Sequence, residues 1–126
     1  MRAIDTNVLV RLIVRDDSKQ TEAAEIFVAK GAWVSLLVLA ESLWVLQTVY
    51  ELDSGQIGGA VEMLLSHHHL TVQDADAVSL ALLSFRRKPA LGFSDCLILE
   101  IARKAGHLPL GTFDKALAKL GGAQKL

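Results

Sequence analysis

The chain has little cysteine, no long apolar run and no excess of positive charge, and each absence excludes a class of protein. Cys96 is the one cysteine, so neither an intramolecular disulfide nor a cysteine-based zinc site can form. Apolar runs such as residues 36–40 are far shorter than the roughly 20 residues of a membrane span. Asp5 and Asn7 interrupt the one early stretch that resembles a signal peptide. We therefore expect a cytoplasmic protein that has no contact with a membrane.

The charge balance argues against a protein that binds nucleic acid mainly through a broad basic surface. The 13 Lys and Arg residues are offset by 14 Asp and Glu residues, which gives a net charge of −1. If the protein acts on nucleic acid, local basic patches and metal ions must supply the attraction. A length of 126 residues predicts one domain over residues 1–126, and a hydrophobic content of 52% leaves room for a protein partner.

Short strands and helices alternate along the whole sequence. Strands are predicted in the first five residues, at 33–35, at 70–72, at 108–114 and in the tail after Gly122. Helices are predicted at 8–13, from a Ser18 cap to Gly31, at 37–50, at 57–65 after a turn and cap at 53–55, from an Asp74 or Asp76 cap to the basic run at 86–88, from a Ser94 cap to Gly106, and at 115–120. This alternation predicts a three-layer α/β/α sandwich with a short, mostly parallel central sheet. The helix after Ser18 is expected to have Ala23, Ile26 and Phe27 on one apolar face. The helix at 37–50 is expected to have one apolar row of Leu39, Leu43, Leu46 and Tyr50.

Four acidic residues recur in similar surroundings. Asp5 and Asp114 each follow a short apolar strand, Asp95 begins a helix, and Glu41 lies within the helix predicted at 37–50. In a parallel sheet with right-handed crossovers, all four positions can share the carboxyl edge of the sheet. Four carboxylates at one place would form an oxygen-rich site for a hard divalent cation.

Taken singly, each acid also has a structural explanation. Glu41 falls between Val38 and Val45 on one helix row, so we expect it to be partly buried and therefore paired, protonated or metal-bound, unless it faces solvent at the edge of that row. Asp95 in a first helical turn is favoured by the helix dipole. Asp114 is also a suitable cap for the helix predicted at 115–120.

Two other clusters have ordinary explanations. His67, His68 and His69 are consecutive and point in different directions, so they are poorly placed to chelate one ion, and a solvated loop is expected. The basic residues at 86–88 suit the last turn of a helix, or alternatively a phosphate-contacting patch.

Four motifs occur in a fixed order along the chain: Ile-Asp-Thr-Asn-Val-Leu at 4–9, Leu-Ala-Glu-Ser-Leu-Trp-Val-Leu at 39–46, Phe-Ser-Asp-Cys-Leu-Ile at 93–98, and Thr-Phe-Asp-Lys at 112–115. The ordered set resembles the PIN-domain family, and more closely the toxin nucleases of the VapBC toxin-antitoxin type. The resemblance covers essentially the whole chain and implies a PIN-like sandwich.

The resemblance implies an endoribonuclease that depends on Mg²⁺ or Mn²⁺ and cleaves RNA with a metal-activated water. By the family pattern the acidic positions, which would hold the metal, are Asp5, Glu41, Asp95 and Asp114. The neighbouring polar positions are Thr6, Asn7 and Thr112, which would orient the carboxylates or a metal-bound water. For Thr112, turn chemistry is an equally good explanation. The resemblance further implies a small antitoxin protein as partner and a homodimer of the toxin.

Alternative functions remain open at this point. A Mg²⁺-dependent phosphatase also begins with an acid after its first strand, but such enzymes present Asp-x-Asp, and the third position here is Asn7. A non-catalytic module that binds RNA or protein on the same fold would not need the acids. A DNA nuclease is disfavoured because no long insertion is present to clamp a duplex.

Overall fold

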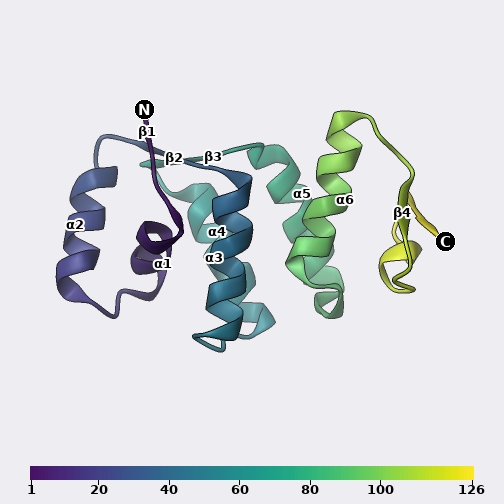
Figure 1. The fold of residues 1–126 in the computed structure, drawn as a ribbon, viewed down its shortest axis with the longest axis horizontal. Coiled ribbons are helices and arrows are strands. Elements are labelled where there is room, and N and C mark those ends of the chain that lie inside the picture. The colour runs from purple at the N-terminus through teal and green to yellow at the C-terminus, as the bar shows by residue number, and fades with distance from the viewer. The chain divides into compact units, whose positions relative to one another are not determined.

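The computed structural model describes all 126 residues, and they form two compact units (Figure 1). The N-terminal unit comprises Met1–Ala75 and the C-terminal unit Asp76–Leu126. Six α-helices alternate with five short strands, and every strand pair is parallel. The predicted α/β fold with short parallel sheets is therefore confirmed. The longest helices have 13 residues, and none has the length and apolar content of a membrane span.

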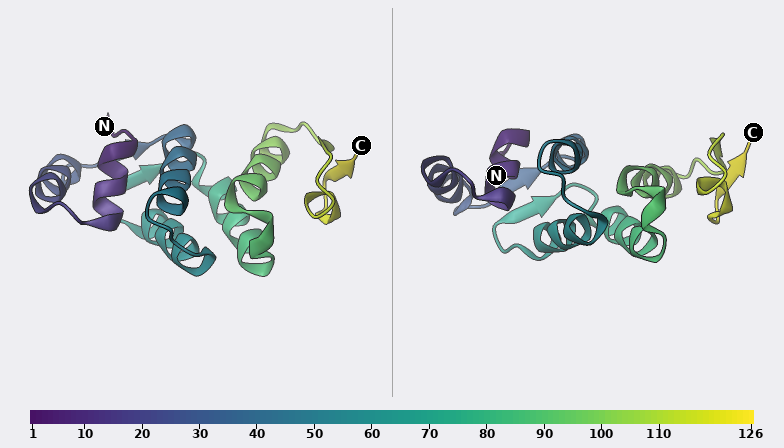
Figure 2. Two further views of the ribbon diagram at one scale, coloured as in Figure 1. Left: turned by 60° about the horizontal axis from the view of Figure 1, so that its bottom comes forward. Right: turned by 90° about the horizontal axis from the view of Figure 1, so that it is seen from below.

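The N-terminal unit is itself layered. Its elements in chain order are β1 (Arg2–Ala3), α1 (Thr6–Val14), α2 (Ser18–Val28), β2 (Ala32–Val34), α3 (Leu36–Thr48), α4 (Ser54–Ser66) and β3 (Leu70–Val72). The strands form one parallel sheet in the order β1-β2-β3, with Trp33 opposite both Ala3 and Thr71. Within this unit, α1 and α3 lie on one face of the sheet and α4 lies on the other (Figure 2).

The core of the N-terminal unit follows the apolar rows of its helices. Leu39, Leu43 and Leu46 of α3 are at most 2% exposed, as their predicted row requires. The apolar face predicted for α2, which contained Ala23, Ile26 and Phe27, is wrong. The buried row is instead Thr21, Ala24 and Val28, whose i, i+3, i+7 spacing forms a continuous stripe. Ile26 consequently remains 67% exposed.

Acidic and hydroxyl side chains fix where the helices of this unit begin. Asp5, Asp17, Ser35 and Asp53 each accept the N–H of the residue three positions later, at the starts of α1, α2, α3 and α4. The predicted cap at Ser18 is one residue late, because the Asp17 carboxylate already accepts that hydrogen bond and Ser18 is the first helical residue. The Gln56 side-chain oxygen in turn accepts the Asp53 N–H, which completes a capping box.

The C-terminal unit is a helix pair followed by a small two-stranded sheet. Its elements are α5 (Ala75–Arg87), the 3₁₀ turn η1 (Pro89–Leu91), α6 (Phe93–Ala105), β4 (Leu110–Thr112), the 3₁₀ turn η2 (Leu117–Lys119) and β5 (Ala123–Lys125). Phe85 of α5 and Phe93 of α6 pack edge to face, with ring centroids 5.8 Å apart. Lys104 of α6 forms an ion pair with Asp76 of α5 at 2.8 Å.

Four predictions made from the sequence concern elements or element boundaries in this unit. The helix predicted at 115–120 is wrong, because only one 3₁₀ turn fits before Gly121 and Gly122 lead into β5. The predicted Ser94 cap of α6 is also wrong, since Gly92 occupies the N-cap position and makes no side-chain hydrogen bond. The predicted stop at Gly106 is confirmed, with φ +82° in the left-handed region that favours glycine. The tail strand is confirmed as β5, parallel to β4.

Candidate functional site

Asp5 lies at the carboxyl end of β1 and caps α1. Ile4 before it is buried, and one carboxylate oxygen of Asp5 accepts the Val8 N–H at 3.1 Å. The side chain is exposed and has no cationic partner. A carboxylate has more acceptor capacity than one N–H can use, so the second oxygen of Asp5 is available to a cation.

Thr6 and Asn7 follow Asp5 directly in the first turn of α1. Asn7 is exposed, and together with Asp5 it lines a groove of about 380 Å³ between α1 and α2. Thr6 is half-buried and does not line this groove. Asn7 therefore shares the surroundings of the Asp5 carboxylate, as a residue that orients a bound water would.

Glu41 lies in the second turn of α3, the helix that begins at the carboxyl end of β2. Because β1 and β2 are parallel, Asp5 and the start of α3 belong to the same edge of the sheet. The predicted partial burial of Glu41 is wrong, because its side chain is exposed. The buried row of α3 runs through Leu39 and Leu43, and a residue two positions after Leu39 lies on the opposite side of the helix.

Asp95 lies in the first turn of α6 and is half-buried. Burial raises the pKa of its carboxyl group, and the negative charge of Asp114 raises this pKa further. No cationic side chain or N–H group pairs with Asp95. Both effects disfavour the ionised form, and a bound cation would favour it.

Asp114 follows β4, as predicted, and its carboxylate organises the turn after the strand. One oxygen accepts the N–H groups of Ala116 at 2.8 Å and Leu117 at 3.0 Å. The Asp114 N–H in turn donates to the hydroxyl of Thr112 at 3.0 Å. Thr112 therefore performs the turn chemistry considered from the sequence, and by doing so it holds the backbone that carries Asp114.

The structure thus groups the predicted acids unit by unit. The charge of Asp114 acts on Asp95 within the C-terminal unit, and Asp5 shares a groove with Asn7 in the N-terminal unit. Within neither unit do three Asp, Glu, His or Cys side chains gather around one point. His67 and His69, which lie in the predicted loop between α4 and β3, bond to each other, because the His69 N–H donates to Nδ1 of His67 at 3.1 Å.

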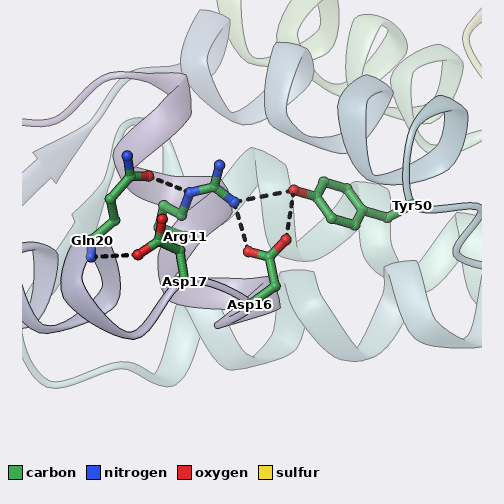
Figure 3. Close-up of polar contacts among 5 residues, drawn as sticks. All are labelled: Arg11, Asp16, Asp17, Gln20 and Tyr50. Carbon is green, nitrogen blue, oxygen red and sulfur yellow. Dashed lines mark hydrogen bonds and ion pairs between the residues drawn. The ribbon is translucent and has the colours of Figure 1, made fainter.

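A polar cluster near the Asp5 groove was missed by the sequence reasoning (Figure 3). Arg11 of α1 donates to Gln20 at 2.6 Å, to Asp16 at 2.6 Å and to the Tyr50 hydroxyl at 3.1 Å. The hydrogen bond with Tyr50, more than the charge of Asp16, raises the pKa of Arg11. Tyr50 is 39 positions from Arg11, so no local pattern could have joined them.

A family model of the PIN domain matches residues 3–123, which is nearly the whole chain. The chain belongs to the PIN domain family. No curated protein matches it. PIN domains are generally nucleases that use divalent metals, and membership of the family places this chain in the nuclease class.

The acidic residues of this PIN domain suit a divalent metal by their chemistry. Magnesium and manganese prefer carboxylate oxygens and keep several waters, so one or two direct carboxylates are sufficient. In the C-terminal unit, Asp95 and Asp114 supply two carboxylates, and the charge of Asp114 acts on Asp95. Asp5 supplies a third oxygen donor without a cationic partner. By residue type, the carboxylates of each unit are therefore ligands that a hard divalent cation prefers, and within neither unit do three of them gather at one point.

Proposed function

We propose that this PIN domain is an endoribonuclease that depends on Mg²⁺ or Mn²⁺, with Asp5, Glu41, Asp95 and Asp114 acting in one centre of a single domain. The observation that carries the proposal is the half-buried Asp95 carboxylate, which has no cationic partner and lies in the field of the negatively charged Asp114. Crowded carboxylates repel each other, and a divalent cation removes that repulsion. The match to the PIN domain family supports the nuclease class.

The chain's own residues would position the metal and the substrate. A bound cation supplies an activated water for attack at phosphorus and charge to stabilise the phosphorane-like transition state. Asp95 and Asp114 would hold it from the C-terminal unit, while Thr112 keeps Asp114 in place through the Asp114 N–H. Asp5 is fixed by its bond from Val8, and the neighbouring Asn7 amide would orient a water.

The finer part of the proposal is a cytoplasmic toxin of a type II toxin-antitoxin pair. Its partners would be an RNA substrate, a small antitoxin protein and a second copy of the same chain. Exposed apolar side chains on α3 and at its C-cap support a protein partner, since Leu37, Trp44 and the C-cap residue Val49 are 75%, 61% and 64% exposed. In this role, expression without the antitoxin should arrest growth, and the Asp5→Asn variant should relieve the arrest.

The central test is RNA cleavage by the purified protein. Wild type should cleave RNA with Mg²⁺ or Mn²⁺ and stop when EDTA is added. Asp5→Asn and Asp95→Asn should each lose at least about 100-fold in rate, because a metal ligand supplies several kcal/mol of transition-state stabilisation. Asparagine caps a helix as well as aspartate, so Asp5→Asn should retain the fold.

Asp53→Asn is the matched control. Asp53 also caps a helix through an exposed carboxylate, but it lies at the start of α4 and is not among the proposed metal ligands. Its variant should cleave RNA at the wild-type rate. Cleavage at the wild-type rate by both Asp5→Asn and Asp95→Asn would overturn the proposal.

Two further outcomes would identify a different function. A covalent phosphoenzyme trapped with a phosphate ester would indicate the phosphatase alternative; none should form, because the nucleophile proposed here is water. RNA binding that is unchanged by loss of the acids, without any cleavage, would indicate a non-catalytic binding module.

A further inference from the structure

Two adjoining grooves follow one side of α2 in the N-terminal unit. The first, of about 380 Å³, is lined by Asp5, Asn7, Arg11 and Gln20 and by the ring of Phe27. The second, of about 410 Å³, is lined by Arg2, Ile26 and Lys30 and again by Phe27. Ala23 and Phe27 belong to both grooves, so the two form one continuous surface, which we call the α2 track.

At its Asp5 end, the α2 track presents hydrogen-bond donors without partners. One terminal nitrogen of Arg11 serves Asp16 and Tyr50, and its Nε serves Gln20, which leaves the second terminal nitrogen free (Figure 3). The Gln20 side chain accepts through its oxygen and leaves its amide nitrogen free. The cluster thus holds Arg11 rigidly while keeping N–H groups for an acceptor such as a phosphate oxygen.

At its other end, the α2 track presents a cation stacked on an aromatic ring. The Arg2 guanidinium carbon lies 3.8 Å from the centroid of the Phe27 ring, and Arg2 also donates to the Phe27 carbonyl oxygen at 3.1 Å. These two contacts fix the guanidinium plane, while Arg2 remains exposed. An exposed guanidinium plane held in this way is a platform on which an unpaired nucleobase can stack.

Covalent geometry places this platform close to the proposed reaction centre. Arg2 and Asp5 are three residues apart, so their Cα atoms are separated by at most about 11 Å. A base stacked on Arg2 would therefore belong to a nucleotide close to a phosphate bound by the cation proposed at Asp5. Lys30 adds a positive charge at the far end of the same surface.

We propose that the α2 track binds the single-stranded RNA segment beside the cleaved bond, with a base stacked on Arg2 and phosphates contacted by Arg11 and Lys30. This inference rests on the proposed ribonuclease function. Cations interleaved with an aromatic ring are the surface that single-stranded nucleic acid requires. A duplex hides its base faces, so it cannot use the Arg2 platform.

The test measures binding without cleavage. A fluorescently labelled single-stranded RNA of about ten nucleotides, within the usual site size, is titrated with protein in EDTA and followed by anisotropy. Arg2→Ala and Phe27→Leu should each weaken binding roughly tenfold, the loss of one stacked base. Lys30→Ala should weaken binding less, and should reduce the slope of log affinity against log salt by about 0.7.

Arg2→Lys separates stacking from charge. Lysine keeps the positive charge and loses the planar group, so the salt slope should stay at the wild-type value while affinity falls as in Phe27→Leu. Lys125→Ala is the control for loss of one charge, because Lys125 is an exposed residue of β5 that lines neither groove. It should bind RNA as wild type does. Circular dichroism would verify that each variant is folded.

The outcomes distinguish failure of this inference from failure of the proposed function. Suppose that wild type cleaves RNA with metal and that Arg2→Ala and Phe27→Leu bind RNA as wild type does. This result would overturn RNA binding at the α2 track and support the proposed ribonuclease function. If wild type does not cleave RNA but these variants still bind RNA more weakly than wild type, RNA binding at the α2 track is supported and the ribonuclease function is rejected. Tighter binding of a duplex than of the single strand, or no binding of RNA by wild type, would also overturn the track.

Discussion

At Asp95, burial and the charge of Asp114 act in the same direction, and each raises the pKa of the carboxyl group. When the pKa of an acid is higher in the folded than in the unfolded protein, the folded state binds more protons. Stability is then lost as pH rises from the unfolded value of about 4 through the folded value. Above the folded pKa the metal-free protein carries this loss in full.

Asp95→Asn should therefore raise the melting temperature of the metal-free protein at pH 7 by a few degrees, because the amide has no charge to desolvate or repel. The gain should disappear well below pH 4, where wild-type Asp95 is protonated in both states. Thermal melts in EDTA across pH 3 to 8, a range set by the usual carboxyl pKa of about 4, measure both effects. A variant that melts below wild type at pH 7 would show that Asp95 is a structural residue.

Single residues were predicted from the sequence with uneven success. The positions of Asp5 and Asp114 after short strands were correct because an apolar run followed by an acid is a local signal. The exposure of Glu41 was not predicted, since both flanks of α3 are apolar and hydrophobicity alone does not mark its solvent side. Only packing against α1, with Leu39, Leu43 and Leu46, decides which side is buried.

Among the elements, α1 and the end of α3 are joined by the polar cluster of Figure 3. The Tyr50 hydroxyl accepts from Arg11 at 3.1 Å and donates to Asp16 at 3.2 Å. Arg11 also reaches Gln20, so one cluster connects α1, α2 and the residue after the C-cap of α3. Arg11, Asp16 and Tyr50 share one set of hydrogen bonds, so their contributions to stability should not be additive.

Tyr50→Phe should lower the free energy of unfolding by about 1 kcal/mol, the usual net contribution of a hydrogen-bonded hydroxyl. Urea titration followed by circular dichroism provides the measurement. In an Asp16→Asn background the same change should cost less, because one of the two bonds is already weakened. Equal costs in the two backgrounds would mean that the hydroxyl contributes independently of Asp16.

Element boundaries followed from local chemistry where a side chain ends or starts a helix. The caps at Asp53 and Gly106 were predicted because a turn residue and a left-handed glycine have few alternatives. The helix predicted at 115–120 failed since the turn after Asp114 is set by two N–H groups bonded to its carboxylate, and β5 begins too soon for a full helix. Such competition between neighbouring elements is not visible in local propensity.

For the whole molecule, the proposed metal centre makes stability depend on cation concentration. A ligand that binds only the folded state stabilises it by about 2.7 kcal/mol at 100 times its dissociation constant. Mn²⁺ should therefore raise the melting temperature of wild type in a concentration-dependent way. Asp95→Asn and Asp114→Asn should lose most of this shift, while Asp53→Asn should retain it. An equal shift in all four proteins would place the cation elsewhere.

Chain order alone predicted the class of the fold, because alternating strands and helices demand parallel pairing, which all three strand pairs show. It also predicted which acids follow strands. The α2 track could not be predicted in this way. The track arises because Thr21, Ala24 and Val28 of α2 face the core. Phe27 therefore lies outside the buried row, and its ring packs against the guanidinium of Arg2, which is distant in sequence.

The glycine before α6 lets the start of that helix open more easily than the starts of α1 to α4. Gly92 has no side chain that can accept a hydrogen bond from the first amide groups of α6. The amides of Ser94 and Asp95 therefore lack the side-chain cap that the starts of α1 to α4 have. Deuterium should therefore replace hydrogen at these amides sooner than at the Val8 and Gln56 amides, whose hydrogens are held by carboxylates. The backbone around one proposed ligand would thus open more readily than the backbone around Asp5.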